Sequence, residues 1–505
     1  MGSSRSGSRS VALWASAVSM LFVALVAATP GSPFQPVLPP DAQPSGPLRW
    51  LAGVVGFDRL GAGALATIGI LAVASAAIAF LLVLRAAWRR EISLRTVIGL
   101  AVAYHVVVLF LPLLFSRDVY SYAYYGKIAG IYHANPYVRT PADFHWDPLA
   151  AFVGPKWVRT PAVYGPLFTL ASSLVAKIVD SIGGFIVAFR LIAVAASLGT
   201  IAIVARLVGR EWPERAPFAV ALIGLNPVVL FQSVASGHND LLVMLSIAGA
   251  LALVFSGREL AATAVLAIGT LVKATAAVPL LLLLVVVVAR RPRGERARAL
   301  LGHLAVAGGI GLVFALRFVN TTDPSLGMVE LAKHEGWLAP SRFFRRLLDA
   351  VSGDTLGVAA RIAFPLVLLG AVFLIARALA RRGASVTPFA LGAAWGWGLL
   401  FLMLLGPVLL PWYVTWILPL AWLLPSVPRA VVIGTGTALT VSQFTAEPGR
   451  FTGAYDANLF WGHYVVTPVV IGLLVWLAID LLRRVRRGAP LEDEPREVAA
   501  ATAEH

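Results

Sequence analysis

Cysteine is absent from this 505-residue chain, and acidic residues are scarce. Without a thiol the protein has no disulfide framework and no cysteine nucleophile or metal ligand. Only 25 Asp and Glu stand against 41 Lys and Arg, and charged residues make up 13% of the sequence against 59% hydrophobic residues. Soluble globular domains carry about twice that share of charge. The composition therefore excludes an ordinary soluble domain and indicates a protein built mainly of membrane spans.

Long apolar runs recur along the whole chain, which is typical of many transmembrane helices. Arginines occur in short blocks between these runs, and loops with this bias stay on the cytoplasmic side of a membrane. The net charge of +16 therefore reports topology rather than nucleic-acid binding, with attraction to anionic lipid headgroups as a secondary effect. The arginine blocks lie at residues 85–95, 206–215, 290–298, 377–382 and 483–487.

The apolar runs predict an all-α, polytopic transmembrane helical bundle of about 14 crossings plus one re-entrant half-helix. The first run, 11–29, is expected to be a retained signal anchor, with a cleaved signal peptide as the alternative. The run at 164–179 is assigned as the half-helix, because a full crossing there would put the arginines of 206–215 outside. The other predicted spans are 64–87, 96–115, 185–207, 218–235, 241–255, 260–272, 276–288, 300–318, 357–378, 390–405, 408–424, 430–444 and 464–482.

This topology divides the chain into three expected parts. Residues 1–93 form an N-terminal membrane-anchor region with a proline-rich external segment at 30–47, residues 94–482 form the main transmembrane domain, and residues 483–505 form a disordered tail. Both termini lie in the cytoplasm of a plasma-membrane protein, whereas the long polar segments at 116–162 and 320–355 lie outside. Polar side chains thus gather on the outer face, which is expected of a membrane enzyme with one functional side.

Two charged residues are the leading candidates for chemistry. Asp118 stands where the span at 96–115 ends, a place for a general base, although carboxylates at helix ends are often only structural. Lys273 lies between two apolar runs of about 13 residues, each roughly 20 Å long, which predict a short hairpin. An ammonium at that depth costs about 2.5–3.5 kcal/mol on insertion scales. Binding a lipid phosphate would offset this cost, and snorkelling to the interface is the alternative.

Other polar and aromatic residues share the predicted outer side. His238, Asn239 and Asp240 lie between two spans, where they could hold a ligand or simply cap a turn. A His beside an Asp could bind a metal, but no second carboxylate cluster with ligand spacing accompanies it. Tyrosine rings can stack on sugars and donate hydrogen bonds, with an interfacial aromatic belt as the alternative. The remaining candidates are Arg117, Tyr122, Tyr125, Arg159, Tyr164, His334, Trp412 and Tyr413.

Several short motifs follow one another along the chain: SRDVYSY (116–122), NPY (135–137), YGPL (164–167), GHND (237–240), LVK (271–273) and PWYVTW (411–416). They resemble the bacterial integral-membrane mannosyltransferases of the GT-C superfamily, in particular the polyprenol-phosphate-mannose-dependent α-1,6-mannosyltransferases of actinobacteria. The resemblance spans about residues 94–482 and implies a catalytic carboxylate in the first large external loop, which corresponds to Asp118. Many superfamily members carry a paired acidic motif there. Arg117 occupies the neighbouring position here, which puts a divalent metal in doubt and favours a cationic phosphate clamp.

The resemblance implies transfer of a hexose, most simply mannose, from polyprenyl phosphate to a cell-envelope glycan or glycolipid on the outer face. Asp118 would take the proton of the acceptor hydroxyl as it attacks the anomeric carbon with inversion. The departing phosphate would be stabilised by Lys273, Arg159 and Arg117. No cofactor and no nucleic-acid partner is expected. The residues expected to hold the sugars are Tyr122, Tyr125, Tyr164, His238, Asn239, Asp240, His334, Trp412 and Tyr413.

Two other functions stay open at this point. A lipid-linked sugar transporter or flippase would also use broken helices and an intramembrane lysine, but the sequence shows no internal repeat and its polar residues favour one side. A transferase that uses another sugar, such as arabinose or glucose, or a protein acceptor fits the same motifs. The chain has no Gly-rich Lys-Ser/Thr nucleotide loop, and nucleotide sugars are cytoplasmic. Direct use of a nucleotide sugar is therefore not expected on this topology.

Overall fold

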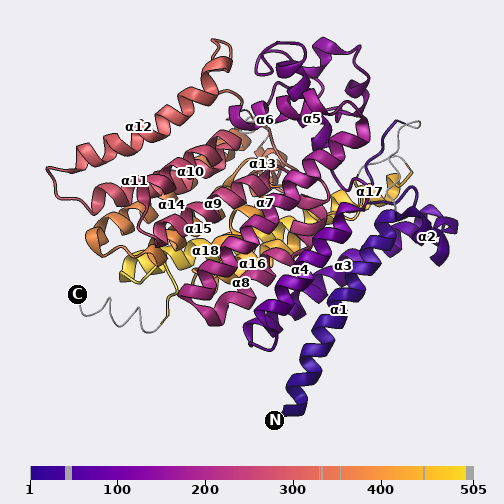
Figure 1. The fold of residues 1–505 in the computed structure, drawn as a ribbon, viewed down its shortest axis with the longest axis horizontal. Helices are drawn as coiled ribbons and strands as arrows, with labels where there is room; N and C mark the ends of the chain where they lie inside the picture. The colour runs from indigo at the N-terminus through magenta and orange to yellow at the C-terminus, as the bar shows by residue number, and fades with distance from the viewer. Residues whose placement is uncertain are drawn as a thin grey trace.

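The structure is a computed structural model that describes residues 2–39, 48–328, 330, 334–352, 354–446 and 450–495. Within these ranges it is a bundle of helices without strands (Figure 1), which confirms the predicted all-α polytopic fold. In chain order the α-helices are α1 (Gly2–Ala28), α2 (Arg49–Val55), α3 (Ala62–Trp88), α4 (Leu94–Leu109), α5 (Asp118–Gly130), α6 (Pro166–Ile178), α7 (Ile182–Glu211), α8 (Ala216–Gly224), α9 (Asp240–Phe255), α10 (Glu259–Val272), α11 (Ala277–Ala289), α12 (Arg296–Ala315), α13 (Pro340–Ser352), α14 (Asp354–Arg382), α15 (Pro388–Leu405), α16 (Ser426–Thr440), α17 (Thr452–Trp461) and α18 (Thr467–Arg487).

Eight helical segments of the described chain are long and apolar enough to cross a membrane, and shorter apolar helices of 10–17 residues lie among them. α9 and α15 are apolar on all sides and buried, so they form the middle of the bundle. The spans built on α12 and α14 are only 6% and 17% buried. Their apolar side chains therefore face outward, where lipid would cover them. The number of crossings and the orientation in the membrane stay predictions.

The N-terminal region packs against the rest of the bundle. α1 lies along α3, and α3 contacts α8. Phe34 is fully buried and its carbonyl accepts a hydrogen bond from Phe115 N at 2.8 Å. The described part of the proline-rich segment is thus held close to the main bundle, while residues 40–47 lie outside the described residues. The predicted boundary at residue 93 stays a prediction.

Several predicted spans differ from the observed helices, and proline is the main reason. The span expected at 96–115 ends at Leu109, shortly before Pro112, because proline cannot continue a helix. The span expected at 408–424 consists of two buried 3₁₀ segments, η11 (Pro411–Trp416) and η12 (Leu418–Leu420). The span expected at 218–235 is α8 followed by a π-helix, η6 (Val228–Val234). α6, with 13 residues, has the length of the expected half-helix.

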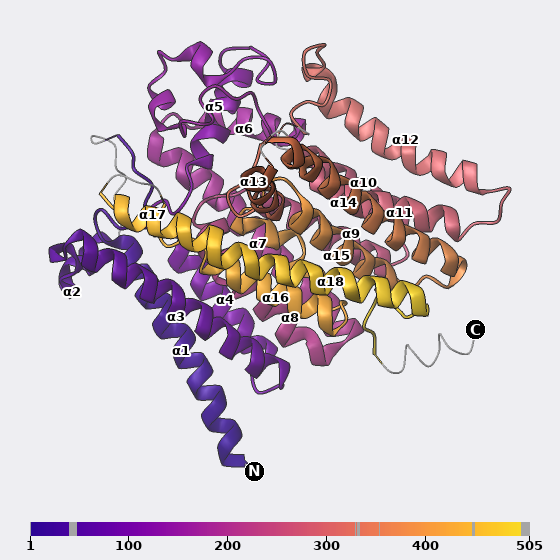
Figure 2. The same cartoon turned by 180° about the vertical axis from the view of Figure 1, so that it is seen from behind.

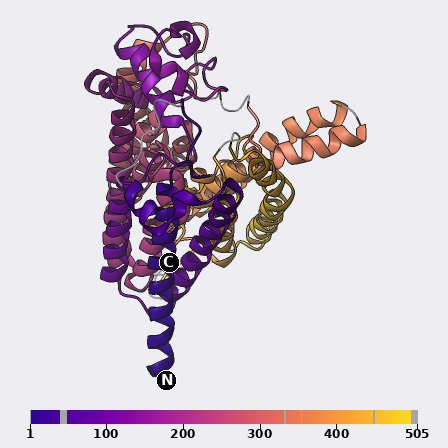
Figure 3. The same ribbon diagram turned by 90° about the vertical axis from the view of Figure 1, so that its right-hand side faces the viewer.

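The two long polar segments, expected as loops, contain helices. α5 begins at Asp118 and packs against α6 so closely that a Cβ on Gly126 would lie 2.2 Å from Ser172 O. α13 lies within the segment 320–355, is seen nearly end-on in Figure 1 and projects sideways from the bundle in Figure 3. Helix α5 therefore gives Asp118 a fixed position at its first turn.

The C-terminal segment differs from the predicted disordered tail. α17, the π-helical turn η13 (Gly462–Val466) and α18 follow one another without a break and form the long helix in front in Figure 2. α18 runs to Arg487, and the chain then turns back so that Leu491 and Glu492 are buried. Asp493 N donates a hydrogen bond to Leu423 O at 2.7 Å. The prediction of disorder is wrong for 483–495, and residues 496–505 lie outside the described residues.

Candidate functional site

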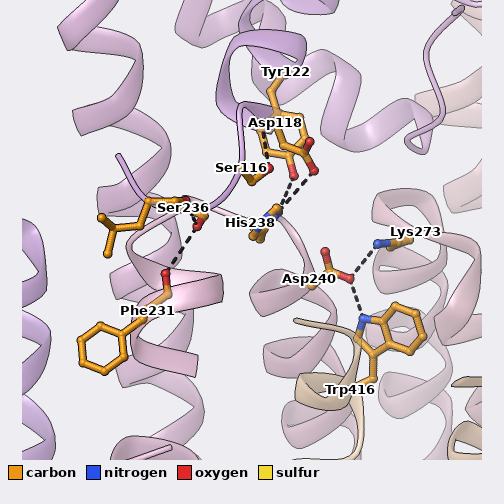
Figure 4. A network of polar contacts seen from close by, with 10 residues as sticks. Ser116, Asp118, Tyr122, Phe231, Ser236, His238, Asp240, Lys273 and Trp416 are labelled. Carbon is orange, nitrogen blue, oxygen red and sulfur yellow. Dashed lines mark hydrogen bonds and ion pairs between the residues drawn. The ribbon is translucent and has the colours of Figure 1, made fainter. Parts of the chain in front are cut away.

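Asp118, His238 and Tyr122 lie together in one network of polar contacts (Figure 4). The carboxylate Oδ2 lies 3.4 Å from His238 Nδ1, and the Tyr122 hydroxyl lies 3.2 Å from the same nitrogen. Asp118 is the first residue of α5, where the helix dipole favours a negative charge, and its backbone N–H donates to Ser116 Oγ at 3.1 Å. Asp118 and His238 are 120 residues apart in the sequence, and the packing of α5 against the turn before α9 brings them together.

Burial sets the protonation of this pair. It raises the pKa of Asp118 from 3.8 to about 6, against the lowering effects of the Ser116 hydroxyl and the charge of Lys273. Burial also lowers the pKa of His238 well below its usual value, and the positive charge of Lys273 acts in the same direction. His238 is therefore neutral and Asp118 titrates near neutral pH. A carboxylate with such a pKa is well matched to general-base chemistry.

Lys273 is held in a second contact group beside the first. Its Nζ donates to Asp240 Oδ1 at 2.7 Å, and Trp416 Nε1 donates to the same oxygen at 2.7 Å. The ammonium also lies 4.4 Å from the ring centre of Tyr413 and 5.2 Å from that of Trp416, within cation–π range. The lysine follows α10 at the tip of the α10–α11 hairpin, and it is only 7% exposed. It is buried among partners rather than extended to the surface.

The turn that carries His238 depends on a glycine. Gly237 has a φ of +66°, and a Cβ there would lie 2.8 Å from Val119 Cγ1. Only glycine tolerates that conformation freely, so the turn can approach the start of α5. This close approach is what brings His238 to Asp118.

Arg190, in α7, fixes the segments on both sides of the site. Its buried guanidinium donates to the carbonyl oxygens of Leu109, Leu111, Pro112 and Ala235 at distances from 2.5 to 3.2 Å. Arg190 was not among the site residues predicted from the sequence. The sequence does contain a sign of its importance, because an arginine inside a predicted membrane span is expected to have a specific role.

Several polar atoms of the turn have no partner among the described residues. They are His238 Nε2, both side-chain polar atoms of Asn239, and Asp240 Oδ2, and all are buried. A buried polar group without a hydrogen bond costs about 1–3 kcal/mol, so native structures rarely keep several together. The His238 ring stacks on Trp412, with ring centres 3.8 Å apart and an interplanar angle of 19°. The stacked His238 ring and the unpartnered polar atoms of the turn form a rigid polar surface that suits a hydroxyl-rich ligand.

A largely apolar pocket of about 200 Å³ lies against Lys273. Its walls come from the start of α11, the end of α15 and the 3₁₀ segment η11, and include Val278, Leu402 and Val408. Lys273, Tyr413 and Trp416 line it as well. One group of side chains therefore combines an ammonium, an aromatic wall and an apolar cavity.

The other residues expected at the site are placed differently. The Tyr164 ring packs edge-on against Tyr122 at 4.8 Å, and the Tyr125 hydroxyl donates to Thr160 O at 2.8 Å. Arg159 is exposed and makes no ion pair with the described residues. His334 packs against Trp157, with ring centres 6.0 Å apart, and Arg117 is half-buried just before α5. The described residues contain no group of three or more metal-ligating side chains.

Comparisons with known proteins agree with the motifs. A family model described as "Alpha-(1->6)-mannopyranosyltransferase, N-terminal domain" matches residues 13–290, which include Asp118, His238 and Lys273. "Alpha-(1->6)-mannopyranosyltransferase A" of Mycobacterium tuberculosis is 28% identical over 369 residues, covering 69% of this chain and 68% of that protein. The protein of the same name from Corynebacterium glutamicum is 26% identical over 178 residues, 35% of each chain. No solved structure matches this chain.

Proposed function

This chain belongs to the alpha-(1->6)-mannopyranosyltransferase family, and on that premise we propose that it transfers mannose from polyprenyl phosphate to a hydroxyl of a cell-envelope glycan or glycolipid. The reaction takes place at the outer face of the plasma membrane with inversion at the anomeric carbon. The observation that carries this proposal is the meeting of Asp118, His238 and the Lys273–Asp240 pair at the edge of an apolar pocket. The names of the relatives support mannose as the sugar.

The donor lipid enters the pocket beside Lys273. Its apolar walls suit a polyprenyl chain, whereas Lys273 Nζ suits the phosphate at its end. An ammonium has three hydrogens, and Asp240 Oδ1 accepts one of them. The others are directed to the phosphate oxygens, and the rings of Tyr413 and Trp416 hold the side chain in place. Arg117 and Arg159 act as further cationic groups when donor and acceptor are bound.

Asp118 serves as the general base. Its carboxylate takes the proton of the acceptor hydroxyl while that oxygen forms a bond to the anomeric carbon. The bond between the anomeric carbon and the phosphate oxygen breaks at the same time, and its electron pair leaves with the phosphate. Negative charge grows on the leaving group, and Lys273 stabilises it electrostatically. Displacement from the opposite face converts a β-linked donor into an α-linked product.

The unpartnered atoms of the 237–240 turn hold the sugars. His238 Nε2 and the Asn239 amide offer hydrogen-bonding positions to sugar hydroxyls. Tyr122 and Trp412 fix the His238 ring from two sides. Tyr164 supports Tyr122 by edge-on packing, Tyr125, Tyr413 and His334 are proposed as further sugar contacts, and the proposed chemistry uses no cofactor.

Mannose transfer from labelled polyprenyl-phosphate-mannose to a short α-mannoside, in membranes that carry the protein, tests the proposal. Asp118→Asn keeps the size of the side chain but cannot accept the proton, so the transfer rate is expected to fall about 10²–10⁴-fold. The matched control is Asp58→Asn, at an exposed carboxylate of the N-terminal region. It is expected to leave the rate unchanged.

The products separate this function from its alternatives. A transferase forms a new glycosidic bond and releases polyprenyl phosphate in equal amounts, whereas a flippase moves labelled lipid across the bilayer without either product. If the protein transfers another sugar from the polyprenyl phosphate that carries it, and does not use the mannose donor, the choice of mannose is wrong. Full activity of Asp118→Asn would move the base to another residue.

A further inference from the structure

Helix α13 has an unusually clear division into two faces. Arg342, Arg345 and Arg346 share it with phenylalanines and leucines, and the exposed apolar residues include Leu347 and Val351. The helix lies across the spans and projects from the bundle (Figure 3). A basic amphipathic helix in this orientation is typical of a segment that lies in the membrane interface.

The arginines of α13 fall into two classes. Arg345 is fully engaged, because it makes bidentate hydrogen bonds to Glu335 at 2.6 to 3.0 Å and a further one to Asp349 at 2.8 Å. Arg342 and Arg346 lie four residues apart, so they are neighbours on the helix surface, and form no ion pair with the described residues. Like charges at this spacing destabilise a helix. Burial and the charge of Arg346 lower the pKa of Arg342, against the raising effect of the Glu335 carboxylate, which Arg345 already binds. A bound anion would stabilise the two neighbouring arginines.

A pocket of about 310 Å³ lies between this arginine face and the junction of α17 and η13. It is lined by Trp337, Arg342, Arg346, Leu459, Phe460, His463 and Tyr464. No carboxylate is among these residues. Phe460 and Tyr464 are 63% and 57% exposed and belong to a helix long enough to cross a membrane. The pocket thus has a cationic base and an aromatic rim that opens toward the surface where lipid would lie.

We propose that this pocket binds the anionic headgroup of a membrane phospholipid, at a site separate from that of the polyprenyl phosphate. Arg342 and Arg346 bind the phosphate and its net negative charge. Phe460 and Tyr464 contact the glycerol backbone and the start of the acyl chains, as aromatic residues do at membrane interfaces. The lipid holds α13 against α17 and η13.

The pocket is physically connected to the donor pocket. Trp337 packs onto Gly462, where a Cβ would lie 1.8 Å from the indole ring. The neighbouring Gly336 N donates to Pro407 O at 2.9 Å, and Pro407 lines the pocket beside Lys273. A lipid that orders α13 therefore also orders one wall of the donor pocket.

Native mass spectrometry of the full-length protein, titrated with dioleoyl-phosphatidylglycerol or dioleoyl-phosphatidylcholine, tests the site. The double variant Arg342→Gln/Arg346→Gln is expected to bind phosphatidylglycerol about 10- to 30-fold more weakly, from about a kilocalorie per mole for each basic residue near an anionic lipid. Its affinity for phosphatidylcholine and for polyprenyl phosphate, each measured in the absence of phosphatidylglycerol, is expected to stay the same. The matched control, Arg49→Gln/Arg59→Gln, removes two exposed arginines of the N-terminal region and should keep wild-type affinity.

Three results would overturn the proposal. The first is unchanged phosphatidylglycerol affinity in the double variant. The second is a loss of polyprenyl phosphate binding alone, which would assign the pocket to the donor. The third is complete displacement of phosphatidylglycerol by millimolar inorganic phosphate, which would make it a general anion site. If the double variant loses affinity for every lipid, the single variant Arg346→Gln decides, since that side chain is exposed. A selective loss of about fivefold supports the site, and no loss rejects it.

Discussion

Buried polar side chains gather at two places, one near each end of α7. Near its start lies the group of Asp118, His238, Asp240 and Lys273, and beyond its end lies the C-terminal segment around Asp493. In the second group every arginine has a carboxylate. Arg215 and Arg429 both lie 3.0 Å from Asp493 Oδ2, and Arg382 lies 2.5 Å from Glu492. The charges of this group belong to the chain itself and hold the C-terminal segment in place.

Both groups keep buried polar atoms without a partner among the described residues, and Arg215 Nη1 and Glu492 Oε2 are examples in the C-terminal group. The Asp118 group differs because its unused atoms belong to His238 and Asp240, which contact Asp118 and Lys273. Lys273 has Asp240 as its counter-charge, yet Asp240 Oδ2 and His238 Nε2 are buried without a partner. Evolved interiors keep such groups where a ligand completes them. Neither a buried charge nor an unused polar atom identifies a site by itself. A carboxylate in contact with an imidazole, close to an ammonium that lines an apolar pocket, does so, and variants at the two places should therefore have opposite effects on activity and stability.

The largest contrast is expected at Lys273. Replacement by glutamine removes the charge that stabilises the departing phosphate, so kcat is expected to fall about 10²–10³-fold. Mannose transfer at saturating donor measures this effect, and Lys177→Gln, at an exposed lysine, is the control. The double variant Lys273→Gln/Asp240→Asn removes the unpaired carboxylate and should fold normally while staying inactive. Activity within threefold of wild type would contradict the assignment.

A variant at Asp493 is expected to lower stability and to leave kcat unchanged, the opposite of the variant at Lys273. Asp493→Asn leaves Arg215 and Arg429 without their shared counter-charge, and because the aspartate is 33% exposed the expected loss of stability is only about 1–2 kcal/mol. Thermal unfolding in detergent measures the change. The rate of transfer per folded molecule should equal that of the wild type, and a loss of kcat would show that the two ends are coupled.

The pH dependence of kcat/KM also distinguishes the Asp118 group from the group around Asp493. Asp118 has a pKa raised to about 6, so the fraction of base falls about tenfold for each pH unit below 6. kcat/KM should fall in this way below pH 6 in both the wild type and Asp493→Asn. The residual activity of Asp118→Asn should not show this fall. Because the native state holds this proton more tightly than the unfolded chain, the carboxyl contributes stability below about pH 4 that is lost as the pH rises through 6. Asp118→Asn should therefore have a higher Tm than the wild type at pH 8.

The smallest effect is expected at Trp412. Replacement by leucine removes the ring that stacks on His238, a contact worth about 0.5–1.5 kcal/mol beyond burial. Orientation of the imidazole should loosen, so kcat/KM is expected to fall about 3- to 10-fold. Trp14→Leu, at a ring that is 71% exposed, is the control and should leave kcat/KM unchanged. An equal fall in both variants would show a general effect on the bundle.

Much of the fold follows from local sequence. Apolar runs that are long enough to cross a membrane form helices, because a single segment in lipid can satisfy its own backbone hydrogen bonds only as a helix. The hairpin around Lys273 and a short helix at α6 were predicted from such runs and from the residues that interrupt them. The half-helix in the membrane and the role of Asp118 stay predictions. The short motifs also resembled the mannosyltransferase family to which the chain belongs.

The tertiary structure alone decided how these pieces meet. Nothing local pairs Lys273 with Asp240, places Trp412 on the His238 ring or directs Arg190 to four carbonyl groups. The 3₁₀ segments 411–416 and 418–420 and the burial of Leu491 and Glu492 also escaped prediction, because they are stabilised by neighbours distant in the chain. Hydrophobicity selects which segments enter the membrane, since it acts on each segment by itself. The partner of a buried charge depends on distances across the bundle, and those exist only once the helices have packed.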